Sequence, residues 1–256
     1  MLRIQLASDI HLEQNPGLTF ADVITPVADV LVLAGDIGCP AHHSYADFIK
    51  AASRAFKHVV LITGNHEYRT CAPHTMEDTD AHIAALCRPL GNVHYLANGA
   101  NVTIGDLNFI GATLWSNVPI DQFTSEQQAH MNATWQVVSR APGVPWTPAE
   151  GNRVHAEHLA AIERAVNAGC AQNKKNVIVT HHAPLLNGPF KRDDFPRNTL
   201  YATDLTNAFL PQYMSAWLFG HTHFNYMSVH NGVFVASNQY GAKGISGWNR
   251  SFALSL

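Results

Sequence analysis

The stretch VVLITGNHE, residues 59–67, joins a run of aliphatic side chains directly to a group of polar ones. A continuous aliphatic run of this length is typical of a β-strand that is buried on both faces. Such a strand normally ends in a turn, whereas this one ends in Asn65, His66 and Glu67, whose polar groups are costly to bury without partners. The stretch therefore predicts a buried strand with a functional site at its carboxyl end.

Four other apolar runs of strand length also end in polar side chains. They are residues 2–7, followed by Asp9 and His11; residues 30–34, followed by Asp36; residues 177–179, followed by His181 and His182; and residues 216–219, followed by His221 and His223. Each ending alone has an ordinary explanation, since a Gly-Asp pair is often a turn and a His pair is often a surface feature. Ligands of open α/β folds lie outside the carboxyl ends of the strands, so five such endings predict one shared site.

Helix-like segments alternate with these runs, which favours an α/β fold. We expect helices over residues 44–56, 78–87 and 147–168. Thr147 and Pro148 suit the N-cap and first turn of the last helix.

Other segments predict smaller features of the same domain, which spans residues 1–256. Two alternating runs within 101–114 predict a hairpin, and residues 226–254 are expected to form short strands. Residues 115–170 predict a largely helical excursion from the sheet. The sequence leaves open whether this excursion caps the site.

The composition argues against nucleic acids and membranes as binding partners. The formal net charge is −3 and no basic stripe is present, which argues against a broad nucleic-acid face. No apolar run is long enough to cross a membrane, and no signal-peptide layout begins the chain. The four cysteines lack CxxC spacing, so we expect free thiols and a cytoplasmic protein. The oligomeric state is left open.

The types of side chain at the strand ends indicate metal ions. Aspartate, histidine and asparagine without cysteine suit Mn, Fe, Zn or Ni, and we expect two divalent ions with Mn first among them. About seven candidate ligands are too many for one tetrahedral ion, whereas two ions that share one carboxylate would use them all. Sites with two such ions are suited to in-line displacement at phosphorus.

In this order, the motifs D-x-H, G-D, G-N-H-E, H and G-H-x-H resemble the signature of the calcineurin-like metallophosphoesterases, and the layout is similar to that of small uncharacterised bacterial members. The resemblance implies a four-layer α/β/β/α sandwich with two central mixed sheets. It implies one metal held by Asp9, His11 and His223, a second held by Asn65, His181 and His221, and Asp36 as the bridge between them. It further implies that His66 is not a ligand but faces the substrate as an acid or hydrogen-bond donor.

Several nearby side chains are candidates for supporting roles. Glu67 either orients His66 or serves as a first-turn carboxylate of a helix. His182 is expected beside the ligands rather than among them. Tyr68, Arg69, Lys191, Arg192 and Arg197 are candidates for substrate contact, although charged side chains of this kind are commonly just solvated. Trp115 and Tyr240 either stack a base or pack in the core.

The expected activity follows from these parts. We expect hydrolysis of phosphodiesters of small, nucleotide-like substrates by attack of a metal-bridging hydroxide. The alternatives are a phosphomonoesterase of small metabolites and, third, a non-catalytic scaffold with the same fold. A protein Ser/Thr phosphatase is disfavoured, because Asp36 is followed by residues 37–40, Ile-Gly-Cys-Pro, instead of that subfamily's Asp-Arg-Gly element.

Overall fold

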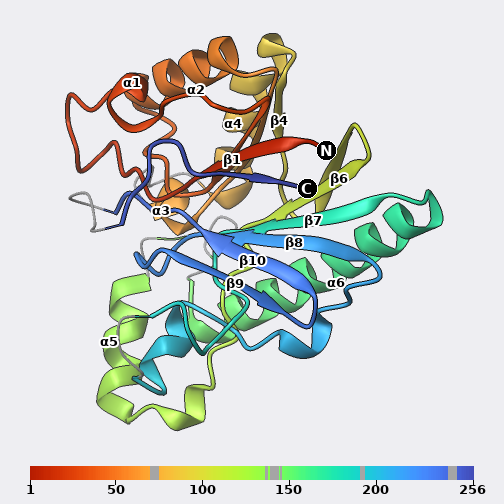
Figure 1. Cartoon of the computed structure of the whole chain (residues 1–256). Coiled ribbons are helices and arrows are strands. Elements are labelled where there is room, and N and C mark those ends of the chain that lie inside the picture. The colour runs from red at the N-terminus through yellow and green to blue at the C-terminus, as the bar shows by residue number, and fades with distance from the viewer. Residues whose placement is uncertain (70–74, 136–137, 139–143, 145, 191–193, 242–246) are drawn as a thin grey trace.

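The computed structural model describes residues 1–69, 75–135, 138, 144, 146–190, 194–241 and 247–256, and side chains in positions 132–135 are excluded. Two mixed β-sheets lie face to face, with helices on both outer faces (Figure 1). This is the four-layer α/β/β/α arrangement that the motifs imply.

The first sheet has the strand order β11-β1-β2-β3-β4. Its members are β1 (Arg3–Ala7), β2 (Val30–Ala34), β3 (His58–Ile62), β4 (Val93–Tyr95) and β11 (Ala253–Ser255). Strands β1 to β4 are parallel, and β11 pairs antiparallel with β1. The helices beside this sheet are α1 (Phe20–Val23), α2 (His43–Ala55) and α4 (Met76–Cys87), as Figure 1 shows.

The second sheet has the order β5-β6-β7-β8-β10-β9. Its members are β5 (Ala100–Ile104), β6 (Leu107–Ala112), β7 (Lys175–Thr180), β8 (Met214–Phe219), β9 (Tyr226–His230) and β10 (Val233–Ser237). The other helices are α3 (Asn65–Arg69), α5 (Ser125–Trp135) and α6 (Pro148–Ala171), with short 3-10 turns at Arg88–Leu90, Ile120–Gln122, Arg197–Leu200 and Thr206–Ala208. Helix α6 packs on β5, β6 and β7, on the outer face of the sheet.

Strand β2 shows why the apolar runs are continuous. Leu31 and Leu33 face the helices, where they join Phe48 and Ile49 of α2. Residues 30, 32 and 34 face the second sheet, where they join Val177 and neighbouring side chains of the other strands. Full burial stabilises each such side chain by about 1.5–3 kcal/mol, so both faces of the strand must be apolar.

The predicted strands and the predicted hairpin are present within one or two residues of their expected bounds. The three predicted helices correspond to α2, α4 and α6, and the Thr147 hydroxyl accepts a hydrogen bond from the backbone N–H of Glu150. The segment 115–170 contains α5 and α6, and the long helix α6 is part of the outer layer of the sandwich.

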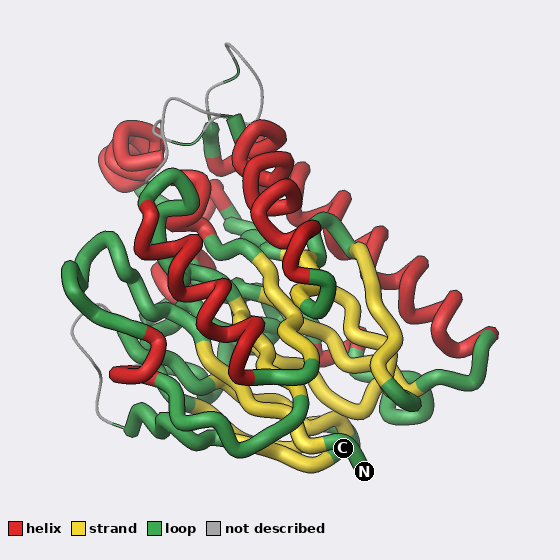
Figure 2. The backbone as a smooth tube through the Cα atoms, turned by 90° about the horizontal axis from the view of Figure 1, so that it is seen from above, coloured by secondary structure: helices red, strands yellow, loops and turns green. Residues whose placement is uncertain are grey.

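The two ends of the chain lie side by side in the first sheet, where Arg3 pairs with Ser255 (Figure 2). Cys87 and Cys170 are free thiols, as expected, and Cys71 lies outside the described residues. Among the helices that the structure describes, none is both long enough and apolar enough to span a bilayer.

Candidate metal centre

The carboxyl ends of five parallel strands, β1, β2, β3, β7 and β8, meet along one edge of the two sheets. The side chains that follow these strands form three groups in which potential ligand atoms lie within 4.8 Å of one another. The first group is Asp9, His11 and His223, and the second is Asp36, His181 and His221. The third group, which shares His11 with the first, is His11, Glu13 and His66. The structure thus brings together the residues that the five sequence motifs supply.

Asp36 connects the first and second groups. Its Oδ2 lies 3.2 Å from Nε2 of His181 and 3.7 Å from Nε2 of His11. Asn65 completes the second group, because its Oδ1 lies 3.1 Å from Nε2 of His181. In the first group, Nε2 of His223 lies 3.4 Å from Oδ1 of Asp9 and 3.1 Å from Nε2 of His11. The structure brings these seven side chains together, and their division between two metal ions stays the prediction that the resemblance implies.

Glycines in the motifs leave room for this close approach. A Cβ atom at Gly64 would overlap Oδ1 of Asp36, and one at Gly35 would lie 2.7 Å from Nδ1 of His181. A Cβ at Gly220 would lie 2.6 Å from Oδ2 of Asp9. Real Cβ atoms do not approach other atoms so closely, so the glycine of each motif is required by packing at the centre.

The backbone at the centre is unusual as well. Five of the candidate ligands have positive φ: Asp9, His11, Asp36, His221 and His223. The other described non-glycine residues with positive φ are three asparagines, which tolerate this conformation, and the consecutive pair Leu114 and Trp115 that follows β6. Such strain costs on the order of 1–3 kcal/mol per residue and is concentrated at functional sites.

The charges of the metal-free centre are arranged around buried carboxylates. Burial by itself would raise the pKa of Asp36, but His181 and the other nearby histidines hold it well below its usual range. Burial would likewise lower the pKa of His181 and of His11, yet Asp36 raises that of His181 to about 9, and Glu13 with Asp36 raises that of His11 to about 9. Protons therefore compensate the buried negative charge. Divalent cations fit the same donors, since carboxylate, imidazole and amide groups converge there.

His221 behaves differently from these two histidines. Burial, together with His182 and His181, lowers its pKa well below the usual value. A neutral imidazole is the form that ligates a metal, so His221 needs no deprotonation before it can do so.

His66 lies next to the first group, with its ring centroid 4.5 Å from that of His11. Oε1 of Glu13 lies 3.1 Å from Nδ1 of His66 and 3.1 Å from Nδ1 of His11. Burial would raise the pKa of Glu13, but hydrogen bonds with the two histidines lower it to about 2. An ionised carboxylate thus joins the candidate acid to a candidate ligand.

Glu13 was missed by the sequence analysis, whereas Glu67 is the first-turn carboxylate of α3, one of the two roles expected for it, and also binds the backbone after β2. The carboxylate of Glu67 accepts hydrogen bonds from the backbone N–H groups of Gly64, Asp36 and Ile37, at 2.8, 3.0 and 2.7 Å. It ties the ends of β2 and β3 together, and Glu13 takes the position beside His66. The signal for Glu13 was its spacing, since Asp9, His11 and Glu13 alternate along the chain.

The other residues that the sequence proposed for supporting roles differ in their positions relative to the metal centre. His182 is buried next to the ligands, stacked on His221 at a centroid distance of 4.0 Å, with Nδ1 2.7 Å from Oγ of Ser116. Tyr68 is buried and its hydroxyl donates to Asp80, so it belongs to the core and not to a substrate surface. Lys191 and Arg192 lie outside the described residues.

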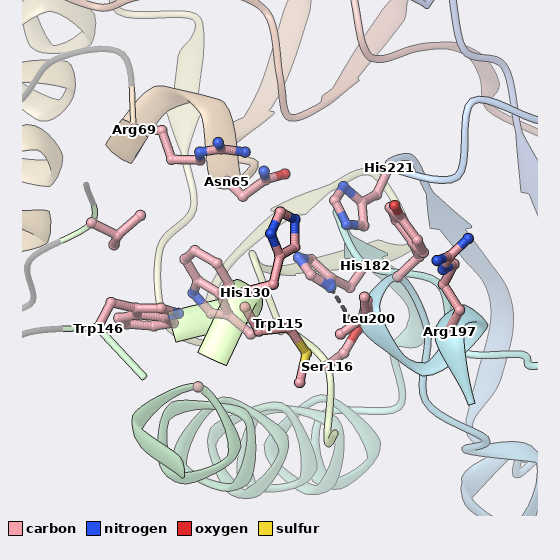
Figure 3. Close-up of a pocket in the computed structure, with 14 residues that line it drawn as sticks. Asn65, Arg69, Trp115, Ser116, His130, Trp146, His182, Arg197, Leu200 and His221 are labelled. Carbon is pink, nitrogen blue, oxygen red and sulfur yellow. Dashed lines mark hydrogen bonds between the residues drawn. The ribbon is translucent and has the colours of Figure 1, made fainter. Parts of the chain in front are cut away.

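A cavity of about 400 Å³ opens beside the second group of ligands (Figure 3). Its lining comes from separate parts of the chain: Asn65, Arg69, Trp115, Ser116, His130, Met131, Val138, Trp146, Gly151, His182, Arg197, Leu200, Tyr201 and His221. Arg69, a predicted substrate candidate, is among them, and so are side chains of the segment 115–170. That segment therefore borders the centre.

Two facing mixed sheets with this cluster at their common strand ends define the metallophosphoesterase class of fold and site. The chain belongs to the calcineurin-like phosphoesterase family, whose sequence profile matches residues 2–225. The family and the fold implied by the motifs are thereby confirmed. Members of this family are metal-dependent hydrolases of phosphoesters, and the clusters described above supply candidate ligands for the metal.

The individual proteins that this chain resembles share less than a third of its residues. An uncharacterised protein of Acanthamoeba polyphaga mimivirus is 27% identical over 257 residues, which cover 93% of this chain and 90% of the viral protein. The phosphopantetheinyl hydrolase PptH of Mycobacterium tuberculosis superposes with a TM-score of 0.61 at 16% identity, over 93% of this chain and 89% of that one. The protein TT1561 of Thermus thermophilus gives a TM-score of 0.53 at 14% identity, over 93% and 89% of the two chains. These structural similarities concern the fold alone.

Proposed function

We propose that this protein hydrolyses phosphodiesters of small, nucleotide-like substrates with the help of two divalent metal ions, Mn being our first choice. The observation that supports a small organic phosphoester as substrate is the cavity of about 400 Å³ that borders Asn65 and His221, and the comparison of esters below tests our choice of a diester. A phosphate at the centre would have room on this side for an organic substituent, since pockets of this size hold groups as large as small ligands.

Seven residues would hold the metals in this proposal: Asp9, His11 and His223 for one ion, Asn65, His181 and His221 for the other, and Asp36 for both. When bound, the ions would supply Lewis acidity to the phosphoryl oxygens and activate the attacking water. The oxygen of that water forms a bond to phosphorus, and the bond between phosphorus and the leaving oxygen breaks.

His66 gives the leaving oxygen its proton. Its Nδ1 lies 3.1 Å from Oε1 of Glu13, and we assign the transfer of the proton to the other ring nitrogen, Nε2. The contact with Glu13 orients the ring, and the product alcohol departs with the proton from Nε2. Glu67 contributes by holding the backbone on which Asp36 and the loop after β3 are mounted.

Matched chromogenic substrates test the proposal. We would strip the protein of metal, add back Mn²⁺, and compare the hydrolysis of bis(p-nitrophenyl) phosphate with that of p-nitrophenyl phosphate. We expect the diester to be hydrolysed with the higher kcat/KM, and we expect Asp36→Asn to abolish turnover. A preference for the monoester would identify a phosphomonoesterase instead. No metal-dependent turnover of either ester with Mn, Fe, Zn or Ni would favour the scaffold.

A further inference from the structure

We infer that the cavity beside the metal centre binds a planar aromatic ring of nucleobase type, with a second anionic group of the same ligand held by Arg69 and Arg197. This inference rests on the proposed function, because it concerns the substrate of the same site. It names the part of the substrate that lies away from the scissile phosphate and the side chains that recognise it.

A continuous line of aromatic rings forms one wall of the cavity. The ring centroids of Trp146 and Trp115 are 4.2 Å apart, and those of Trp115 and His182 are 5.5 Å apart. His182 stacks on His221 at 4.0 Å, and Tyr201 follows at 5.1 Å from His221. The line therefore leads from the apolar end of the cavity past a candidate metal ligand. Trp146, Trp115 and His182 are buried, so the part of the line that is open for stacking is the ring of Tyr201, next to the position of the phosphate.

The conformation of Trp115 indicates that this wall is more than core packing. Leu114 and Trp115 have φ angles of 68° and 55°, a conformation that bulky side chains rarely adopt. Two buried histidines of α6 support the strained turn: Nδ1 of His158 accepts a hydrogen bond from the Leu114 N–H, and Nδ1 of His155 lies 3.1 Å from the Trp115 carbonyl oxygen. Among the described residues other than asparagine and glycine, only candidate metal ligands share this strain. The turn at Leu114 and Trp115 therefore carries the same kind of backbone strain as the candidate metal ligands, and such strain is concentrated at functional sites.

Polar groups on the same wall suit a heteroaromatic ring. The indole N–H groups of Trp115 and Trp146 are buried and have no hydrogen-bond partner among the described residues. An unpaired buried donor is costly, and a shift of these rings on ligand binding, or an ordered water, would satisfy it. Tyr201 is 39% exposed, so part of its ring is open to a ligand.

The charges around the cavity are positive. Arg69 and Arg197 lie on opposite sides of it (Figure 3), and no aspartate or glutamate is among its described lining residues. Arg197 has Asp194 at 3.6 Å, outside the lining, and this ion pair is largely exposed and easily replaced by a ligand anion. Guanidinium groups bind phosphate in a bidentate manner, so a second phosphate is the anion that fits them best.

The binding of two matched phosphate monoesters tests whether the cavity holds an aromatic ring, and this measurement does not require turnover. We would titrate the Mn²⁺-loaded protein with adenosine 5′-monophosphate and with ribose 5-phosphate, following tryptophan fluorescence and calorimetry. The two probes share a phosphate and differ in the ring. We expect the nucleotide to bind about tenfold more tightly, since stacking of one base on an aromatic side chain has an effect of this order. Tyr201→Ala should remove most of the difference, whereas Tyr213→Ala should keep it, because Tyr213 is 41% exposed and lies outside the cavity.

A third probe tests the arginines. Adenosine 3′,5′-bisphosphate should bind more tightly than the monophosphate, and Arg69→Gln or Arg197→Gln should reduce that gain, with the exposed Arg54→Gln on α2 as the control. Equal binding of the nucleotide and ribose 5-phosphate, or a Tyr201→Ala variant that keeps the difference, would overturn the aromatic assignment. No gain from the second phosphate would overturn the assignment of the arginines. Hydrolysis of the chromogenic esters is measured separately, so a failure here is distinguishable from a failure of the proposed function.

Discussion

In the metal centre, each candidate ligand follows a parallel strand by a few residues, and three of the five short motifs that carry the ligands contain a glycine that packing requires. In the neighbouring cavity, the lining comes from α3, from the turn after β6, from the segment 115–170 and from the loops after β7 and β8, and no motif marks it. The two regions share only Asn65 and His221 among their ligands. The carboxyl ends of the central strands position the ligands of the metal centre. The cavity is lined mainly by connecting segments, which in proteins generally vary more than the strands that they join.

This difference predicts that the centre is sensitive to small steric changes and that the cavity tolerates them. Gly64→Ala places a methyl group against Asp36 without changing any ligand. We expect loss of Mn²⁺ binding and of turnover, and a fall of about 1–3 kcal/mol in the free energy of unfolding, as is usual for overpacking. Metal analysis and urea unfolding of the purified variant measure both effects. A variant with normal metal content and activity would remove the distinction between a rigid centre and a tolerant cavity.

The second prediction separates the acid from the metal ligands within the centre. His66→Ala should lower kcat by about 10²–10⁴-fold with nearly normal metal content, since general acid catalysis has an effect of this size. The loss should be larger for an alkyl leaving group than for p-nitrophenolate, because the poorer leaving group depends more on the proton. If metal is lost together with activity, His66 is a ligand and our assignment is wrong.

Glu13→Gln refines this test. We expect a smaller loss than for His66→Ala, with the same dependence on the leaving group, because the amide keeps the hydrogen bond but not the charge. The double variant should be no slower than His66→Ala alone. Glu163→Gln, an exposed substitution on α6, is the matched control for loss of one carboxylate. Additive losses in the double variant would show that Glu13 acts through His11 and the metal.

The smallest expected effect concerns pH. The pKa values of His11 and His181 are raised to about 9 in the metal-free fold, above the usual 6.5. Their contribution to the stability of the metal-free protein is therefore complete below about pH 6.5 and is lost as the pH rises through 9. Metal binding requires the neutral rings, and each displaced proton costs about 1.4 kcal/mol per pH unit below that pKa. The increase in Tm caused by Mn²⁺ should therefore be larger at pH 8.5 than at pH 6.5. An increase independent of pH would show that neither proton is displaced.

Much of the fold and of the centre could be predicted from the sequence alone, because both faces of the central strands are buried and their carboxyl ends carry the polar residues. The run 59–62 had to be a strand between two apolar layers, and Asn65 and His66 had to lie at its end. The clustering of Asp9, Asp36 and His181 followed from the parallel arrangement of their strands.

Only the tertiary structure decided which side chains lie against one another across separate segments. Glu13 reaches His66 from 53 residues away, and Glu67 binds the backbone amides of Asp36 and Ile37 after β2 as well as that of Gly64 in its own loop. Trp115, Trp146 and Tyr201 form one wall although no spacing connects them. Loop conformations depend on contacts between distant residues, and such contacts leave no periodic pattern in the sequence, whereas the strands leave a pattern that can be read directly.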